Sequence, residues 1–237
     1  MKDRRILVFG GRGAIGSAVR ERFAGMGWRV VATSRQPVSA DGVGNVRWIT
    51  CDPEAQSVAP DQFDDGGGYN AVCWTQGANA SDSVFDFSPE RHMALYRANC
   101  LFVLQTLKLL LDRSLITRGA RLVVLGSIWQ NIARQDKLSY VMTKAAVGGL
   151  VRSASVDLAA RGILINAVLP SAIDTPMTRS NLTSDQVARL AGATRFDRLV
   201  THDDVVAAVE FLCSSPNTGI TGQCLPVDLG FCHARLV

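Results

Sequence analysis

Short apolar runs alternate along the chain with longer segments of helical periodicity. The apolar runs cover residues 6–9, 29–32, 46–49, 71–74, 121–125, 163–168 and 224–227. Most are continuously apolar, which is typical of strands that are covered on both faces. The segments between them predict helices at residues 14–26, within 89–111, at 139–160 and at 203–212. Because helical crossovers join parallel strands, the pattern predicts an α/β fold, a doubly wound parallel sheet of about seven strands with helices on both faces.

Helix starts are marked where capping residues precede the periodic segments. Ser88 is followed by Pro89 and Glu90, and Thr201 precedes two aspartates. Such residues satisfy the free N–H groups of a first helical turn. The irregular stretches 37–45, 53–69 and 171–196 do not resemble linkers, and the sequence shows no repeat. We therefore expect a single domain over residues 1–237, with one half at about 1–120 and the other at about 121–237.

Composition and charge exclude several classes of protein. Of the 237 residues, 47% are hydrophobic and 19% charged, which indicates an ordered globular chain. The net charge of +4 is spread without basic clusters, so we expect no nucleic-acid partner. Six cysteines without CxxC spacing favour free thiols in a reducing compartment and no metal site. The apolar run after the basic start ends at Gly10, which favours a strand over a signal peptide. Without an uninterrupted apolar run of membrane length, we expect a cytoplasmic protein with no membrane partner.

A glycine-rich loop follows the first predicted strand and opens the first predicted helix. Its sequence is Gly10-Gly11-Arg12-Gly13-Ala14-Ile15-Gly16. In this setting glycines allow a tight turn and close approach of the backbone to a pyrophosphate, and the helix N-terminus presents N–H groups to negative charge. The loop therefore indicates a dinucleotide site, although a ligand-free turn between strand and helix has the same composition.

The second predicted strand ends with Ser34 and Arg35 instead of an acidic residue. A carboxylate at this point accepts a hydrogen bond from the ribose 2′-hydroxyl of NAD, whereas an arginine suits the 2′-phosphate of NADP. Arg12 could add a second cation on the same phosphate. We therefore expect NADP(H) to be preferred over NAD(H), with a solvated loop arginine as the alternative for each residue.

Tyr140 and Lys144 are four residues apart in a predicted helix, so their side chains share one face. A phenol is a poor acid or base at neutral pH, and a neighbouring ammonium favours its ionised form. Ser127 directly follows a predicted strand, at the sheet edge where ligands bind in doubly wound folds. The three side chains therefore predict one small catalytic site.

These motifs together resemble the short-chain dehydrogenase/reductase family along nearly the whole chain. The resemblance includes Asn99 and the segment Tyr140-Val-Met-Thr-Lys144, in the family's order and spacing. It implies a Rossmann fold in which Tyr140 is the general acid or base and Lys144 favours its ionisation and holds the nicotinamide ribose. Ser127 would bind the substrate oxygen, and Asn99 would hold a water that relays protons. Closing a helix irregularity is the alternative role for Asn99.

The resemblance also implies roles around the cofactor. Asp52 would accept from the adenine amino group, Gly77 would let the cofactor pass close to the backbone, and Thr175 would touch the carboxamide. The full set of expected cofactor-binding residues is Gly10, Arg12, Gly13, Ala14, Ile15, Gly16, Ser34, Arg35, Cys51, Asp52, Gln76, Gly77, Ala78, Tyr140, Lys144, Pro170, Ile173 and Thr175. The chain departs from the family pattern in its tighter glycine spacing, in Thr75-Gln76-Gly77-Ala78 and in Pro170-Ser171.

The expected activity is NADPH-dependent reduction of a ketone or aldehyde in a small biosynthetic or acyl substrate, as in the 3-oxoacyl carrier-protein reductases. We expect Ser127, Trp129, Gln130 and Tyr140 to contact the substrate, and Trp129 could equally be a packing residue. By resemblance, the helices that carry Asn99 and Tyr140 pair in a homodimer or homotetramer. Two alternatives remain open: an NADP-binding regulator without turnover, and an isomerase or lyase that uses the nucleotide transiently.

Overall fold

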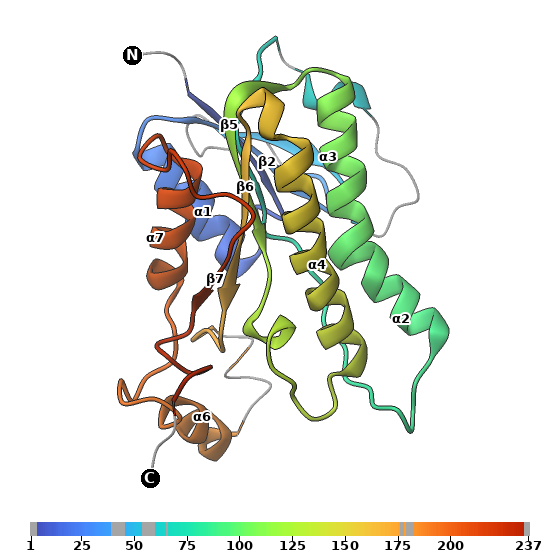
Figure 1. Ribbon diagram of the computed structural model, residues 1–237, viewed down its shortest axis with the longest axis vertical. Helices are drawn as coiled ribbons and strands as arrows, with labels where there is room; N and C mark the ends of the chain where they lie inside the picture. Colours follow the sequence, from blue (N-terminus) through green and yellow to red (C-terminus); the bar gives the residue numbers. More distant parts are fainter. Residues whose placement is uncertain are drawn as a thin grey trace.

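Seven parallel strands form one sheet in the order β3-β2-β1-β4-β5-β6-β7 (Figure 1). The computed structural model describes residues 4–38, 46–53, 60–64, 66–175, 178 and 183–234. The strands are β1 (Arg5–Phe9), β2 (Arg29–Ser34), β3 (Val46–Thr50), β4 (Tyr69–Trp74), β5 (Ile116–Leu125), β6 (Leu164–Pro170) and β7 (Cys224–Val227). The predicted doubly wound α/β fold is therefore confirmed.

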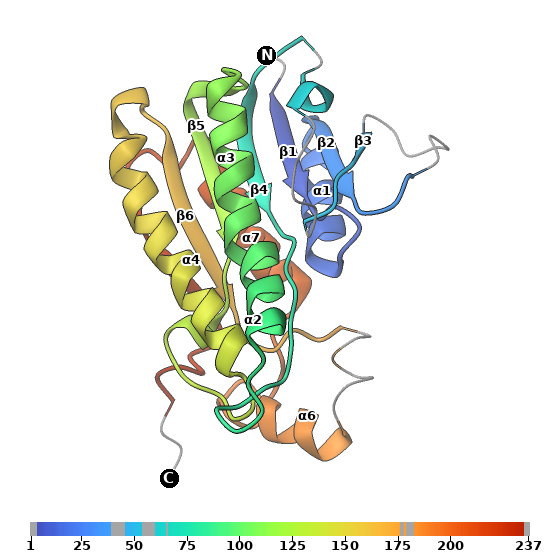
Figure 2. The same cartoon turned by 90° about the vertical axis from the view of Figure 1, so that its right-hand side faces the viewer.

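Helices cover both faces of the sheet (Figure 2). One face carries α1 (Ala14–Gly25) and α7 (His202–Cys213), and the other carries α2 (Pro89–Tyr96), α3 (Phe102–Asp112) and α4 (Leu138–Asp157). Successive residues of β1 serve the two layers in turn, because Ile6 and Val8 belong to one apolar cluster and Leu7 and Phe9 to the other. Burial on both faces explains why this strand reads as an uninterrupted apolar run.

The predicted helix within residues 89–111 has a break in its middle. Residues Arg97–Leu101 form one π-helical turn between α2 and α3, and Asn99 lies in it. The whole run Pro89–Asp112 is the one described segment long and apolar enough to cross a membrane, and half of its most apolar window is buried in this fold. Buried core helices pass the same test of length and composition, so this run agrees with a place in the core.

Helix α6 (Ser184–Ala191) lies in a stretch that we expected to be irregular. Thr183 and Gln186 form a capping box at its start, in which each side chain bonds the backbone of the other residue. In Figure 1 the helix lies beyond the carboxyl end of β6. This places it at the sheet edge where doubly wound folds bind ligands. Short turns complete the chain: η1 (Pro60–Phe63), η3 (Ile128–Gln130) and η4 (Ala159–Arg161).

Candidate active site

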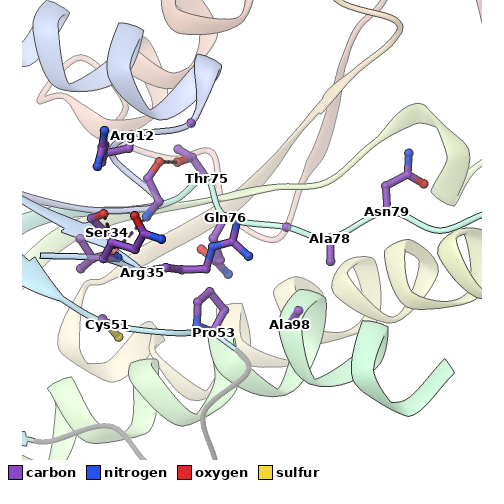
Figure 3. A pocket seen from close by; sticks show the side chains of 15 residues that line it. Arg12, Ser34, Arg35, Cys51, Pro53, Thr75, Gln76, Ala78, Asn79 and Ala98 are labelled. Carbon is purple, nitrogen blue, oxygen red and sulfur yellow. Dashed lines mark hydrogen bonds between the residues drawn. The ribbon is translucent and has the colours of Figure 1, made fainter. Parts of the chain in front are cut away.

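A cavity of about 650 Å³ opens at the carboxyl ends of β1, β2 and β4 (Figure 3). Half of the expected cofactor residues line it, from the glycine loop, the end of β2, the residue after β3 and the loop after β4. The lining residues are Gly10, Arg12, Gly13, Thr33, Ser34, Arg35, Gln36, Cys51, Pro53, Thr75, Gln76, Gly77, Ala78, Asn79 and Ala98. The cavity therefore lies where the sequence predicts a dinucleotide.

The glycine loop has the close contacts that require glycine. Gly10 has a φ of +77°, and a Cβ there would lie 2.8 Å from the Gln76 nitrogen. At Gly16 a Cβ would lie 2.2 Å from the Gly10 oxygen. Helix α1 begins after Gly13 with no side-chain cap and no acidic residue in its first turn. Its first N–H groups are therefore left for an anion at the mouth of the cavity.

Two exposed arginines stand at this end of the cavity. Figure 3 shows Arg12 on the glycine loop and Arg35 after β2, with Ala78 and Asn79 toward the other end. Ser34 is buried beside Arg35, and its hydroxyl accepts from the Gln36 nitrogen at 3.3 Å. The described part of the lining carries no acidic side chain here. The arrangement suits a phosphate monoester better than a free ribose hydroxyl.

Cys51 and Gln76 also line the cavity, one with an apolar side chain and the other with a polar one. Burial raises the pKa of the Cys51 thiol to about 11, so Cys51 remains protonated and acts as an apolar wall. Both polar side-chain atoms of Gln76, Oε1 and Nε2, are buried with no hydrogen-bond partner. Buried amide groups without partners are costly, so the Gln76 side chain fits a polar ligand. This orphaned amide and the uncapped helix both match a dinucleotide.

Lys144, in the second turn of α4, lies behind the cavity wall at Gly77. The side chain is buried, and Nζ donates to the Leu125 oxygen at 3.0 Å. Nζ also lies 5.7 Å from the centre of the Tyr140 ring. A Cβ built on Gly77, which lines the cavity, would lie 3.6 Å from the same Nζ. Lys144 therefore lies next to Gly77 of the cavity wall and close to the Tyr140 ring, although neither Tyr140 nor Lys144 is among the residues that line the described cavity.

Asn99 fastens the loop after β4 to helix α4. Its Oδ1 accepts from the Ala78 nitrogen at 2.8 Å, and its Nδ2 donates to the Ala78 oxygen and to Thr143 Oγ1, both at 3.0 Å. The side-chain amide thus serves mainly as a clamp in the π-helical turn. Thr143 was missed by the sequence analysis, although a polar residue three positions after Tyr140 lies on nearly the same helical face.

Ser127 lies two residues after the end of β5 and caps the turn η3. It is buried, and its Oγ accepts from the Trp129 nitrogen at 3.4 Å. Trp129 packs edge-on against Phe231, and Arg134 lies over its ring at 5.9 Å. Gln130 lies between the end of β5 and α4, close to Gly126 and Gly148. The structure therefore shows Trp129 in a packing role, and substrate contact by either residue stays a prediction.

The expected cofactor residues outside the lining lie on three parts of the fold: Ala14, Ile15 and Gly16 open α1, Tyr140 and Lys144 lie on α4, and the others lie at or after the ends of β3 and β6. Pro170 ends β6, and Ile173 forms an isolated bridge with Val200. Thr175 accepts from the Thr178 nitrogen at 2.9 Å, so its hydroxyl shapes the local turn. Asp52 is exposed beside Cys51. None of Pro170, Ile173, Thr175 and Asp52 lines the described cavity.

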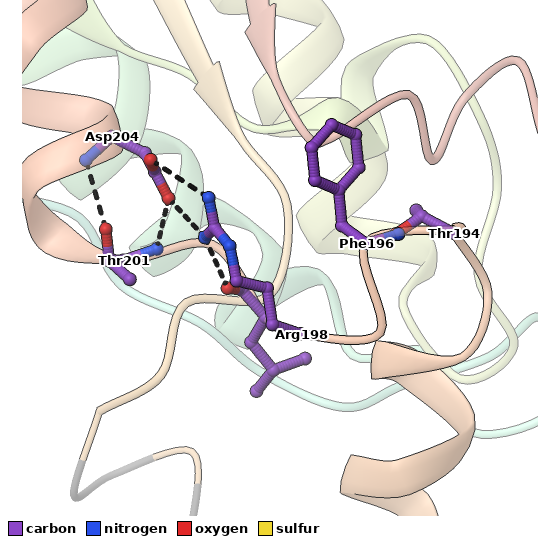
Figure 4. Close-up of polar contacts among 6 residues, drawn as sticks. Thr194, Phe196, Arg198, Thr201 and Asp204 are labelled. Atoms are coloured by element: carbon purple, nitrogen blue, oxygen red, sulfur yellow. Dashed lines mark hydrogen bonds and ion pairs between the residues drawn. The ribbon is translucent and has the colours of Figure 1, made fainter.

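The segment after α6 is anchored to helix α7. Arg198 donates from Nη1 to Asp204 Oδ2 at 2.7 Å and from Nη2 to Oδ1 at 3.3 Å (Figure 4). Thr201 and Asp204 form the capping box of α7, and the bonds from Arg198 lower the pKa of the Asp204 carboxyl to about 2. Phe196, two residues before this anchor, is largely exposed. Over the described ranges, no group of three or more metal-ligating residues is present.

Known proteins with matching sequences cover almost the whole chain. A family model described as enoyl-(acyl carrier protein) reductase matches residues 11–232. The 3-oxoacyl-[acyl-carrier-protein] reductase MabA of Mycobacterium avium is 29% identical over 232 residues, which cover 96% of this chain and 89% of the relative. The 3-oxoacyl-[acyl-carrier-protein] reductase FabG of Escherichia coli (strain K12) is 27% identical and covers 94% of this chain and 95% of the relative.

Solved structures show the same fold. The gluconate 5-dehydrogenase of Burkholderia cenocepacia J2315, in complex with NADP and tartrate, has a TM-score of 0.90 at 24% identity, with 99% of this chain and 97% of that chain covered. A short chain dehydrogenase family protein of Francisella tularensis has a TM-score of 0.85 at 22% identity and covers 98% and 100% of the two chains. From its motifs, its fold and the matching family model, the chain belongs to the short-chain dehydrogenase/reductase family of NAD(P)-dependent oxidoreductases.

Proposed function

We propose that this protein uses NADPH to reduce the ketone or aldehyde group of a small biosynthetic or acyl substrate. The observation that carries the proposal is the position of the Lys144 ammonium, which lies over the Tyr140 ring and next to Gly77 of the cavity wall. It brings a proton donor and a cation to the place where the cofactor's reactive end would pass. A protein that only binds a nucleotide needs no such donor.

The choice of NADPH rests on the charges at the end of β2. Ser34, Arg35 and Arg12 line the part of the cavity that a 2′-phosphate would occupy, and the uncapped N-terminus of α1 would hold the pyrophosphate. Gln76 would satisfy its buried amide on the same ligand. When bound, the cofactor supplies a hydride to the substrate carbon.

The chain's own residues manage the charge and the proton. As the carbonyl carbon gains a hydride, its oxygen becomes negative and needs hydrogen-bond donors. The Ser127 hydroxyl would donate to this oxygen, and the Tyr140 hydroxyl would transfer its proton to it. Lys144 stabilises the phenolate that remains, and its bond to the Leu125 oxygen holds the ammonium in place. In the reverse direction Tyr140 would accept the proton of an alcohol.

The substrate class is supported by the sequence relatives. MabA and FabG are both named as 3-oxoacyl-[acyl-carrier-protein] reductases and match nearly the whole of this chain. At 27–29% identity they support a ketoreductase without defining the acyl group. The exposed Phe196 and the Trp129–Phe231 pair offer apolar surface for such a group.

The test is a titration with NADPH and, separately, NADH, followed by energy transfer from tryptophan to the nicotinamide. A panel of ketones, quinones and 3-oxoacyl thioesters is then added. We expect tighter binding of NADPH and its oxidation by one substrate group. Binding without oxidation by any member would contradict the reductase and favour a regulator. Isomerisation without consumption of the nucleotide would indicate the isomerase or lyase alternative, and failure to bind either nucleotide would overturn the dinucleotide site.

A further inference from the structure

Asp82 is a buried carboxylate that the proposed chemistry does not use. It lies in the loop after β4, a few residues beyond Gly77, and only 4% of its surface is exposed. Burying a carboxylate is costly unless hydrogen-bond donors surround its oxygens. Its donors therefore show which part of the molecule it serves.

Those donors belong to the first turn of helix α4. The Ser139 nitrogen donates to Asp82 Oδ1 at 2.9 Å, the Ser139 hydroxyl donates to Oδ2, and the Leu138 nitrogen donates to the Asp82 main-chain oxygen at 3.1 Å. Lys137, at the N-cap position, provides no side-chain cap. Asp82 thus caps the helix from a distant loop, with its negative charge at the positive end of the helix dipole.

The same loop is fastened to α4 at two other points. Lys137 Nζ donates to Asn79 Oδ1 at 3.1 Å and, at 3.0 Å, to the Ala80 oxygen and Ser81 Oγ. At the other end of the loop, Ala78 is clamped to Thr143 through Asn99. The cavity wall and the helix that carries Tyr140 therefore form one bonded unit.

His92 joins this unit from helix α2. Its Nδ1 lies 2.9 Å from Ser139 Oγ. A serine hydroxyl has one hydrogen, and Ser139 gives it to the Asp82 carboxylate. The hydrogen between Ser139 and His92 must therefore come from Nδ1, which fixes the tautomer of the neutral ring.

We propose that Asp82 is a positioning residue for Tyr140. Through Ser139, the residue just before Tyr140, it fixes the first turn of α4 against the loop that walls the cavity, and His92 completes the contact. The hydrogen-bonded chain runs from the buried Asp82 and Ser139 to the half-buried His92, and it would hold the proton donor at a set distance from the cavity wall. Its effect on turnover rests on the proposed reductase function, whereas the bonded chain itself does not.

The first test reads the tautomer of His92 by ¹⁵N NMR at a pH where the ring is neutral. In the parent protein we expect the hydrogen on Nδ1. In Asp82→Asn, the new amide must keep its oxygen on the Ser139 nitrogen, so its NH₂ donates to the Ser139 hydroxyl. That hydroxyl then donates to His92, and the hydrogen moves to Nε2. The signals of His202 and His233 serve as internal controls, and an unchanged tautomer would overturn the chain.

The second test separates positioning from stability. Asp82→Ala should lower kcat about ten- to hundredfold, with the KM for NADPH within about threefold of the parent, because a misplaced donor slows chemistry more than binding. Asp82→Asn keeps the bond to the Ser139 nitrogen and should recover most of the loss. The stability control is Asn217→Ala, which removes the side-chain bonds of a buried asparagine that follows α7 and lies beside Arg121 of β5, away from the loop that holds Asp82. Equal losses of kcat in both alanine variants would overturn the proposal.

A third measurement decides the proposal even if the parent protein reduces no member of the panel. The chain has three tyrosines, so ¹³Cζ labelling gives three signals, and Tyr140→Phe assigns the relevant one. Asp82→Ala should shift the Tyr140 signal, and Asn217→Ala should not. An unmoved Tyr140 signal in Asp82→Ala would overturn the positioning role, whereas a shift without any turnover would refute only the reductase function.

Discussion

The two sides of the cavity are built in different ways. On the side of β1 and β2, Arg12 and Arg35 are exposed, and the helix N-terminus behind them is uncapped. On the side of α4, Asn99, Thr143 and Lys144 are buried. Their side chains form hydrogen bonds of 2.8–3.0 Å: Asn99 with Ala78 and Thr143, and Lys144 with the Leu125 oxygen. One side presents donors for a ligand, whereas on the other side the side chains of Asn99, Thr143 and Lys144 already have hydrogen-bond partners.

This difference separates binding from chemistry. Free donors at the end of β2 gain their partners only when a charged ligand arrives, so changes there should alter affinity and leave the fold intact. Paired groups on α4 are ordered during folding, which prepares the catalytic geometry before the substrate binds. Changes there should reduce catalysis, and where a clamp is lost they should also reduce stability.

The strongest test of the α4 side is Tyr140→Phe. Loss of the proton donor should lower kcat by about 10²–10⁴-fold, the usual contribution of a general acid. Stability and NADPH affinity should stay near the parent values, because no hydrogen bond of the Tyr140 hydroxyl is found among the described residues. Steady-state kinetics and cofactor titration measure both. Turnover within a few-fold of the parent would disprove the assigned role of Tyr140.

Asn99→Leu should break the clamp on the same side. It leaves the Ala78 N–H and C=O without their partner and should lower the free energy of unfolding by about 2–4 kcal/mol, measured by urea denaturation. The matched control is Asn166→Leu, a buried asparagine that bonds Ile220 and Gln223. Both variants should lose stability, but only Asn99→Leu should lose kcat per folded molecule. Similar kcat values in the two would show that the clamp is structural alone.

The opposite side is tested by Arg35→Asp. Loss of one charge-assisted bond to a 2′-phosphate, worth about 1.5–3 kcal/mol, should weaken NADPH binding about 10- to 100-fold and favour NADH. Stability should change little, because Arg35 is exposed. Arg29→Asp, at the amino end of β2, makes the same change in net charge away from the cavity. An unchanged preference in Arg35→Asp, or an equal change in Arg29→Asp, would remove Arg35 from the phosphate site.

Local sequence patterns predicted the strands and the long helices, but they did not predict a short helix or the contacts between distant residues. The apolar runs identified all seven strands, and Thr201 marked the start of α7 within one residue. Helix α6 was missed even though Thr183 and Gln186 have the spacing of a capping box, because its short amphipathic segment contributes no residue to the buried core. A helix irregularity at Asn99 was considered only as an alternative to its proton-relay role, and the clamp on Ala78 that accompanies the π-helical turn was not predicted, since it joins residues far apart in the chain.

In the candidate site, too, local features could be predicted from the sequence and long-range contacts could not. The glycine loop, Ser127 and the pair Tyr140–Lys144 follow from spacing on single elements, because a strand end and a helix face are local features. The partners of these residues do not. Asp82 and Ser139 are separated by 57 positions, and nothing in the sequence around either residue indicates that they bond. Long-range hydrogen bonds of this kind depend on the assembled sheet.

The smallest expected effect concerns the anchor between Arg198 and Asp204, which sharpens the comparison because it lies outside both sides of the cavity. The pKa of Asp204 is about 2, below its ordinary value of 3.8, so the carboxylate stabilises the fold above about pH 4 and this contribution disappears as the pH falls toward 2. Asp204→Asn should cost about 1 kcal/mol at pH 7, since both side chains are partly exposed and solvent screens the pair.

Thermal melts between pH 2 and 7 measure the difference in stability between Asp204→Asn and the parent protein, which should vanish at the acid end. Asp203→Asn is the control, because it removes the same charge from an 89% exposed side chain that pairs only with the exposed Arg22, at 3.5 Å, among the described residues. A constant difference between Asp204→Asn and the parent at every pH would show that the anchor stabilises through packing instead of charge.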